Sequence, residues 1–291
     1  MVLTGNILID PEHLEAPGNS VISLGSPFSG RRFKAFSEMA DATKVHGSLL
    51  IGQVLHPGRV ADPSVQPRSV IVSNVEMVVT GFHAKPRSAK KEEIKRIVEG
   101  LGFAAEYLEK ADFDDMQVHG AHGLLVSQFL SSSTNLHTHE YGGSLVNQMR
   151  FLLKIFDVVQ SRTSKQFILG IKLNAIELCH RLWSSFDNII SHSLTKSYVK
   201  RRGYYLPWVD GILKTPLEKM EVLLIGGFRT LDGIMPALQS IDAVDMGKPA
   251  THEPSLTTKL HSLRRSHWGL HECCRLRYTI QASHVVDWPV A

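Results

Sequence analysis

Short apolar runs recur along the chain, and Gly, Pro or polar residues bound each of them. Three continuous runs span residues 48–55 (SLLIGQVL), 167–173 (FILGIKL) and 222–227 (VLLIGG). Runs of this length without alternation are typical of strands buried on both faces of a parallel sheet. Residues 3–10 (LTGNILID) and 114–120 (DDMQVHG) predict two more strands.

Segments with helical spacing lie between these predicted strands. The clearest covers residues 89–110, where the apolar positions keep to one face and Ser88 is a candidate N-cap. Further helices are predicted over 33–45, 145–160 and 230–239. Strand and helix therefore alternate, which favours parallel βα units over a sandwich. A series of such units over ~250 residues suits a (β/α)8 barrel.

Two regions depart from this pattern. Residues 191–213 have weak periodicity, and the C-terminal residues are rich in His, Arg, Trp and Cys with little apolar spacing. We expect one barrel domain over residues 1–260 and an irregular tail over 261–291.

Composition excludes several classes of protein. The net charge of +4 and the absence of long Lys/Arg runs give no case for nucleic-acid binding. No apolar stretch approaches the ~20 residues of a membrane span, and the N-terminus does not resemble a signal peptide. The three cysteines form no regular framework, which favours a reducing, cytoplasmic location. The assembly state stays open.

Candidate chemistry concentrates in residues 113–151. His119 and His122 close the predicted strand at 114–120, which places two hydrogen-bond donors where α/β enzymes carry out their reactions. Taken alone, such a pair can equally satisfy backbone carbonyls. The segments 128–130 (QFL) and 141–151 (YGGSLVNQMRF) follow.

This composite pattern resembles the old yellow enzyme family. Its members are FMN-dependent NAD(P)H oxidoreductases, or ene-reductases, built on a (β/α)8 barrel. Three further patches come in the family's order, namely residues 53–59 (QVLHPGR), 170–173 (GIKL) and 226–230 (GGFRT). The resemblance runs from about residue 3 to 260, with a gap near 191–213.

The resemblance implies a set of FMN-binding residues. Gln53 would bond the pyrimidine edge of the ring, and Lys172 would stabilise the negative charge of the reduced ring. Gly226 and Gly227 would expose backbone N–H groups to the FMN phosphate, and Lys248 stands where the family has a phosphate-pairing Arg. Each residue also has a simpler interpretation: Gln53 as a core amide, Lys172 as a snorkelling edge residue, and the two glycines as an ordinary turn.

The resemblance also implies a reaction. His119 and His122 would donate to a substrate carbonyl oxygen, so that hydride from the flavin reaches an activated C=C bond, and NAD(P)H would be the reductant. The partner is thus a small molecule, an activated alkene or enone. No metal is predicted, because 137–140 (HTHE) and 271–274 (HECC) lack a second pair at zinc spacing.

Several positions depart from the family pattern. Leu124 stands where the family has a proton-donating Tyr, while His137 and His139 stand where it has Arg and Asp. The first barrel strand has no counterpart, and the expected sixth strand is replaced by residues 191–213, so we expect an incomplete barrel. These departures keep a second hypothesis open: a catalytically impaired or inactive barrel remnant with a binding role. A flavin-free phosphate-binding barrel explains only the turn at Gly226 and Gly227.

Overall fold

The computed structural model divides the chain into two compact units. The larger unit comprises Thr4–Trp183 with Val285–Ala291, and the smaller comprises Met1–Leu3 with Ser184–His284. The residues that the structure describes are 1–73, 86–174, 223–225, 234–235, 237–239, 242–246, 255 and 277–281. Most of them belong to the larger unit, which holds the His pair, Gln53 and Lys172.

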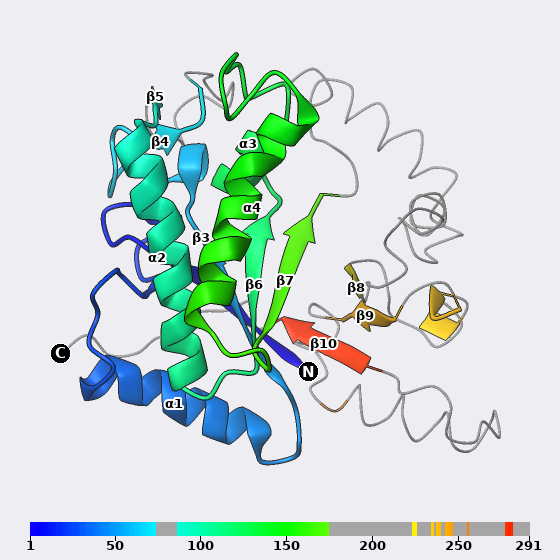
Figure 1. Ribbon diagram of the computed structural model, residues 1–291. Helices are drawn as coiled ribbons and strands as arrows, with labels where there is room; N and C mark the ends of the chain where they lie inside the picture. Colours follow the sequence, from blue (N-terminus) through cyan, green and yellow to red (C-terminus); the bar gives the residue numbers. More distant parts are fainter. Residues whose placement is uncertain are drawn as a thin grey trace. The chain divides into compact units, whose positions relative to one another are not determined.

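The larger unit is built on four neighbouring strands in the order β7–β6–β3–β1 (Figure 1). They are β1 (Val2–Leu8), β3 (Leu50–Leu55), β6 (Asp115–Gly120) and β7 (Ile168–Leu173). β6 pairs in parallel with both β3 and β7, and the short β2 (Ser20–Val21) pairs in parallel with β1. The prediction of parallel βα units is therefore confirmed.

The strand register determines which side chains share a face of this sheet. Gln53 lies opposite Gln117, and His119 lies opposite Lys172. Because side chains alternate along a strand, these four residues project from the same face. Gly52 belongs to the other face, where a Cβ would lie 2.5 Å from Cδ1 of Leu108.

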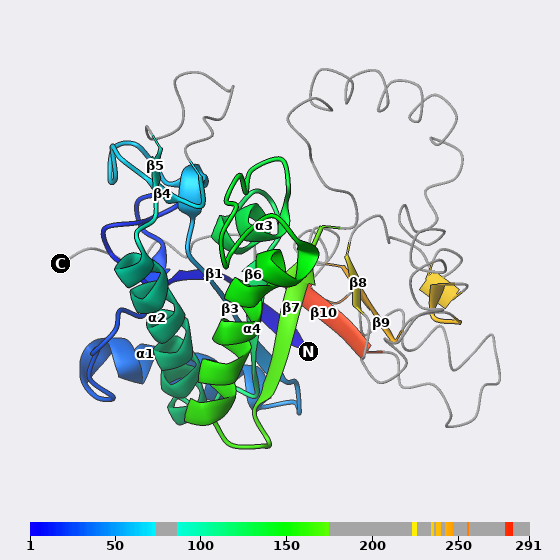
Figure 2. The same cartoon turned by 45° about the horizontal axis from the view of Figure 1, so that its top comes forward.

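Two long helices cover the face that carries Gly52. α2 (Lys91–Lys110) and α4 (Leu145–Arg162) run side by side in both views (Figures 1 and 2). They approach closely at Gly102, where any Cβ would collide with the side chain of Val158. α1 (Gly30–Lys44) adds an aromatic cluster around the fully buried Tyr107, which contacts Phe28, Phe33, Phe36 and Phe103. The helices thus leave the opposite face of the sheet for the polar side chains.

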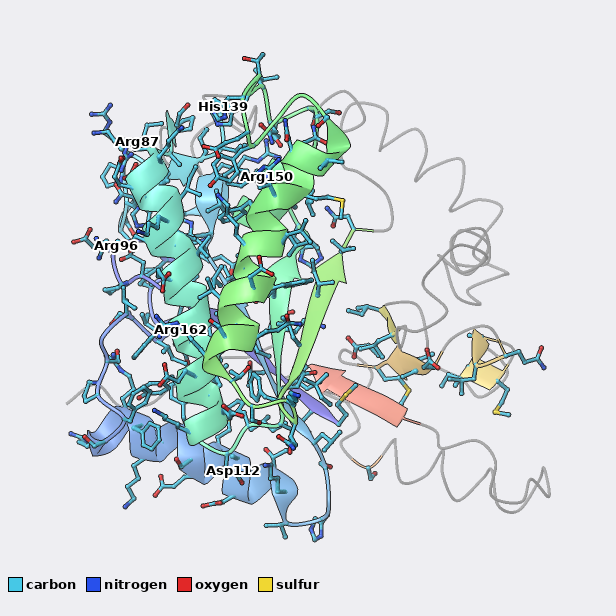
Figure 3. The ribbon with its side chains drawn as sticks, viewed as in Figure 1. Arg87, Arg96, Asp112, His139, Arg150 and Arg162 are labelled. Carbon is cyan, nitrogen blue, oxygen red and sulfur yellow. The ribbon has the colours of Figure 1, made fainter. Side chains whose placement is uncertain are left out.

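Arg162 joins the two long helices at their surface (Figure 3). Its guanidinium donates to Glu99 at 2.8 Å and to Glu106 at 3.2 Å, both on α2. The three side chains are 22–37% exposed, so solvent screens both ion pairs and each contributes only about 0–1 kcal/mol. Apolar contact therefore remains the main attachment of α4 to α2.

Short elements lie around the carboxyl ends of these strands. They are α3 (Leu125–Leu130), the 3-10 turn η1 (Gly58–Val60) and the parallel pair β4 (Val70–Ile71) and β5 (Arg87–Ser88). α3 follows β6 directly, and its Leu125 N–H donates to the carbonyl of His56 at 3.2 Å. This bond ties the turn after β6 to the turn after β3.

The smaller unit contains three short strands that pair in parallel. β9 (Ala243–Asp245) lies between β8 (Leu223–Ile225) and β10 (Arg277–Gln281). β10 also pairs with Val2 and Leu3, the first residues of β1, which belong to this smaller unit. β10 falls in the region where the apolar pattern gave no strand. Residues 191–213 and most of the helix predicted over 230–239 lie outside the described residues.

The predicted elements agree with the described structure to within a few residues. One detail differs, because Lys90 rather than Ser88 is the N-cap of α2, and Glu93 accepts the N–H of Lys90 at 2.8 Å. Ser144 is the N-cap of α4, and its side chain accepts the N–H of Asn147 at 3.3 Å. The described strands do not by themselves close a cylinder. No helix in the described ranges has the length and apolarity to cross a bilayer.

The packing of α4 against α3 gives a test of this architecture. Phe151 is fully buried, and its ring stacks on Phe129 with centroids 4.1 Å apart. We expect Phe151→Ala to lower the free energy of unfolding by about 3–5 kcal/mol, because it leaves a cavity. Urea titration measures this loss. Leu153 is 46% exposed on the same helix, so Leu153→Ala should cost well under half as much; equal losses would contradict this packing.

Candidate functional site

Three predicted site residues lie together on the face that the helices leave uncovered. Gln53 comes from β3, His119 from β6 and Lys172 from β7. Their exposed fractions are 0%, 2% and 7%. Polar side chains this deeply buried need partners within the fold, because water cannot reach them.

Hydrogen bonds join Gln53 to its neighbours on both sides. The Lys172 Nζ donates to the Gln53 Oε1 at 3.5 Å, and the Gln53 Nε2 donates to the Asn6 Oδ1 at 2.6 Å. The backbone N–H of Gln53 donates to the Thr4 hydroxyl at 3.0 Å. Sequence reasoning placed Gln53 and Lys172 in one site but missed Thr4 and Asn6. The available signal was the alternation along residues 3–10, which puts both on one face of β1.

His119 and His122 lie close together, as their spacing suggested. Their ring centroids are 4.9 Å apart and their planes are inclined by 67°. The N–H of Ala121 donates to the Nδ1 of His119 at 3.2 Å, so the neutral ring carries its proton on Nε2. His122 has a positive φ of 56°, and its N–H donates to Asn174, just after β7, at 3.1 Å. The turn after β6 is thus held against the end of β7.

Both rings are neutral at physiological pH. Burial lowers the pKa of His119 to about 2, and the Lys172 ammonium reinforces this effect. His122 is exposed, but partial desolvation by its neighbours, followed by the charge of Lys172, also lowers its pKa. A neutral imidazole with a proton on one nitrogen is a hydrogen-bond donor, and at this pKa it is a poor source of protons.

Leu124 lies immediately before α3 and does not provide a polar group. Its side chain is 1% exposed and packs against Leu8 and Leu55. Its neighbours come from the ends of β1 and β3, so the position is an apolar contact between strands. A reaction in this site that needs a proton must therefore obtain it from a group other than residue 124.

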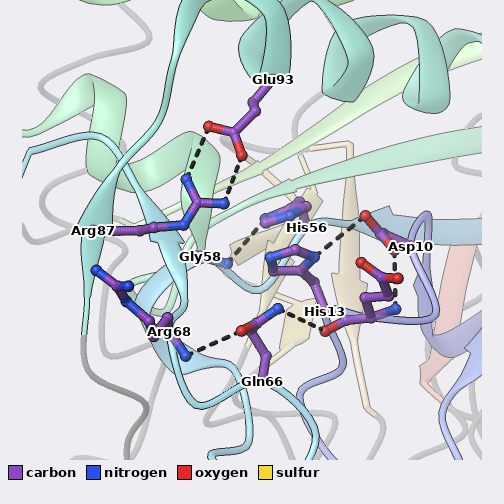
Figure 4. A network of polar contacts seen from close by, with 9 residues as sticks. Asp10, His13, His56, Gly58, Gln66, Arg68, Arg87 and Glu93 are labelled. Carbon is purple, nitrogen blue, oxygen red and sulfur yellow. Dashed lines mark hydrogen bonds and ion pairs between the residues drawn. The ribbon is translucent and has the colours of Figure 1, made fainter.

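A second polar cluster stabilises the turns after β1 and β3 (Figure 4). His13 and Asp10 are paired at 3.2 Å, and the His13 ring lies 4.9 Å from that of His56. The Gly58 N–H donates to the Nδ1 of His56 at 3.2 Å. Burial lowers the pKa of His56 to about 3. Gly58 has a φ of 60°, and a Cβ there would collide with the Gln128 amide, so this turn requires glycine.

The loop before α4 is organised around Asn135. Its Nδ2 donates to the carbonyls of Phe129 and Tyr141, at 2.8 and 2.6 Å. The His137 and His139 rings lie 4.2 Å apart with planes inclined by 30°. Arg150, labelled near His139 in Figure 3, donates to the Glu140 carbonyl at 2.7 Å. Two imidazoles in contact therefore occupy the positions where the family pattern has Arg and Asp.

An additional carboxyl group lies on the same face of β6. Asp115 is 8% exposed, and burial raises its pKa to about 7. Within the described part of the chain, the Oδ1 of Asp115 and the Oε1 of Gln117 are buried without a hydrogen-bond partner. Sequence reasoning did not single out either residue, because a lone carboxylate and a lone amide in a strand carry no motif.

Gly226, Gly227 and Lys248 lie outside the described residues, so the phosphate-binding turn stays a prediction. Over the ranges that the structure describes, no group of three or more His, Cys, Asp or Glu side chains is arranged to hold a metal ion.

Comparison with known proteins decides the family. Residues 5–206 match the model of the NADH:flavin oxidoreductase / NADH oxidase family. The chain belongs to this family. Its resemblance to the old yellow enzymes is thereby confirmed.

Two curated relatives show how much of the family protein the chain spans. It is 35% identical over 284 residues to the NADH-dependent flavin oxidoreductase nadA of Aspergillus parasiticus, covering 88% of this chain and 64% of that protein. It is 33% identical over 153 residues to the 12-oxophytodienoate reductase 1 of Oryza sativa subsp. japonica, covering 50% of this chain and 40% of that protein. The chain thus spans about 40–64% of these relatives.

Solved structures of similar fold agree with this assignment. A 2-naphthoyl-CoA reductase in complex with 2-naphthoyl-CoA matches with a TM-score of 0.75 at 20% identity, covering 89% of this chain and 44% of that one. Morphinone reductase in complex with tetrahydroNAD matches with a TM-score of 0.70 at 22% identity, covering 89% and 77%. At these identities the likeness concerns the fold, and it confirms the α/β class and the barrel type.

The buried carboxyl of Asp115 gives a pH-dependent prediction. Its pKa rises on folding from the usual 3.8 to about 7, so the stability it contributes is full at low pH and is lost as pH rises through about 7. We therefore expect Asp115→Asn to raise the free energy of unfolding at pH 8, by up to about 4 kcal/mol, and by less at pH 5.

Urea titrations at the two pH values measure this difference. Asp157, which is exposed on α4, supplies the control, since Asp157→Asn removes a solvated carboxylate and should change stability little. A gain at Asp115 that does not depend on pH would contradict the buried-carboxyl account.

Proposed function

We propose that this chain is an FMN-dependent NAD(P)H oxidoreductase that reduces an activated C=C bond by hydride transfer. One observation carries the proposal: a buried ammonium, a buried amide and two neutral imidazoles come together on one face of a parallel sheet. Family membership supports the same reaction class.

The donor set fits a flavin. The pyrimidine edge of that ring presents carbonyl oxygens and an N–H, and the Gln53 amide offers both a donor and an acceptor to such an edge. When bound, FMN supplies a two-electron carrier that accepts hydride from a nicotinamide and passes it to an alkene. In this proposal Gly226, Gly227 and Lys248 bind the FMN phosphate.

Lys172 provides the positive charge that a reduced flavin requires. Its side chain is 7% exposed and lies within 3.5 Å of the Gln53 carbonyl oxygen. An ammonium held in such a site acts through a low dielectric, so its attraction for negative charge is little screened. We propose that it stabilises the reduced ring without moving.

His119 and His122 provide the substrate-binding donors. Because His119 is protonated on Nε2 and its pKa is about 2, it can hold a carbonyl oxygen by a hydrogen bond but does not act as an acid. Two N–H donors on the carbonyl of an enone withdraw electrons from its C=C bond, which favours hydride addition at the β-carbon. The amide of the nicotinamide can use the same pair of donors.

The proton that completes alkene reduction does not come from position 124. Leu124 is apolar and buried against Leu8 and Leu55. In our proposal water delivers this proton, and the substrate is a small molecule, an activated alkene or enone. The cytoplasmic location suggested by the three cysteines belongs to the same proposal.

A second candidate function is an impaired barrel with a binding role only. Two observations favour it. Gln53 is fully buried and already bonded within the chain, and the proton-donor position is occupied by Leu124. This candidate keeps the fold and the ligand-binding residues but not the reaction.

The visible spectrum of the purified chain tests the proposal. We expect added FMN to bind with a shifted flavin spectrum, NADH or NADPH to bleach it without oxygen, and an enone to restore it. A chain that takes up no FMN would contradict the flavin account. Bound FMN that neither nucleotide bleaches would favour the second candidate.

The role of position 124 is tested with two aromatic substitutions. Leu124→Tyr adds a phenol that can donate a proton, whereas Leu124→Phe adds a ring of nearly the same size without the hydroxyl. Overpacking should cost both variants about 1–3 kcal/mol of stability. We expect the Tyr variant to reduce a simple enone at least several-fold faster than the Phe variant. Equal rates would exclude this position as the proton-delivery site.

A further inference from the structure

A chain of hydrogen bonds runs from a carboxylate to an ammonium through two amides. Asn6 donates through Nδ2 to the carboxylate of Glu15 and accepts through Oδ1 from the Gln53 Nε2 at 2.6 Å. Gln53 in turn accepts from the Lys172 Nζ at 3.5 Å. The four side chains come from β1, the loop after it, β3 and β7.

The two charged ends fix the direction of every bond in this chain. A carboxylate only accepts and an ammonium only donates. The Asn6 amino group must therefore face Glu15, which turns its carbonyl to Gln53. Gln53 must therefore donate to Asn6 through its amino group, which directs its own carbonyl oxygen toward Lys172. Reversing either amide would set donor against donor and acceptor against acceptor.

Burial makes this direction energetically important. Gln53 has no exposed surface, and its backbone N–H is held by the Thr4 hydroxyl at 3.0 Å. Water cannot replace a lost partner at such a position, so a reversed amide would keep an unsatisfied polar group in a low dielectric. The arrangement in the structure satisfies both ends of the amide at once.

We propose that Asn6 and Glu15 are positioning residues that fix the orientation of the Gln53 amide for its ligand. The inference rests on the proposed function, in which Gln53 bonds the pyrimidine edge of FMN. With one N–H committed to Asn6 and one carbonyl lone pair committed to Lys172, Gln53 offers one N–H and one lone pair in a defined order. A ligand edge with the matching order binds, and one with the opposite order does not.

Two substitutions at Asn6 separate orientation from packing. Leu has nearly the shape of Asn but accepts no hydrogen bond. Asp keeps an oxygen that accepts from Gln53, and an accompanying Glu15→Gln change replaces the second carboxylate by an amide that can donate to it. We expect Asn6→Leu to weaken FMN binding about three- to tenfold, the loss of one buried hydrogen bond. The double variant Asn6→Asp/Glu15→Gln should stay within about twofold of the parent. FMN fluorescence quenching measures the dissociation constants.

Three results would overturn the inference. They are an unchanged affinity in Asn6→Leu, an equal loss in both variants, and a loss in Asn6→Leu that persists in a Gln53→Ala background. In that background the orienting effect has no amide to act on, so we expect Asn6→Leu to add nothing. A residue that acts only through stability would keep its effect there.

A measurement on the flavin-free protein separates this inference from the proposed function. The side-chain amide protons of Gln53, followed by 15N NMR, should exchange slowly in the parent and in Asn6→Asp/Glu15→Gln, and faster in Asn6→Leu and Glu15→Gln. If the parent binds no FMN, the proposed function and the ligand role of the amide both fail. If these substitutions leave the exchange rate of the Gln53 amide protons unchanged, Asn6 and Glu15 do not orient this amide, whether or not FMN binds.

Discussion

The parallel register of β6 with its two neighbours determines which side chains can meet in this protein. With His119 opposite Lys172 and Gln53 opposite Gln117, four polar groups share the face turned away from α2 and α4. A slip of one residue would turn them toward the helices and bring Gly52 to the other side. The large apolar area buried by the helices therefore also holds the polar face in place.

The polar face has an energetic cost that depends on pH. Folding keeps His119 neutral and lowers its pKa. The stability associated with this neutral ring is therefore full above about pH 6.5 and is lost as pH falls toward 2, because the unfolded chain takes up the proton first. Asp115 acts in the opposite direction, because its raised pKa favours folding at low pH. The ammonium of Lys172 lies on the same face and contributes to the low pKa of His119. Such opposed groups are typical of sites where charge is needed for function rather than for stability.

Glycines set the shape of the loops that surround this face. Gly58 has a positive φ and contacts Gln128, while a Cβ at Gly142 would collide with the carbonyl oxygen of His137. Both belong to stretches that the sequence marks by their resemblance to the family, HPGR and YGGS. Only the fold shows why glycine is needed at these two positions. At Gly58 a side chain, and at Gly142 a backbone carbonyl, lies too close for any Cβ.

The sequence by itself determined the parallel strands and the two long helices, since apolar runs and helical spacing are local patterns. The grouping of Gln53, His119 and Lys172 was expected only from the resemblance to the family, and the register of β3, β6 and β7 brings it about. Only the tertiary structure decided that Asn6 bonds Gln53, that Leu124 fills an apolar contact, and that β10 pairs with β9. Each of these depends on segments distant in the chain, whose meeting follows from burial and register. No local pattern of residues encodes which distant partner satisfies a buried polar group.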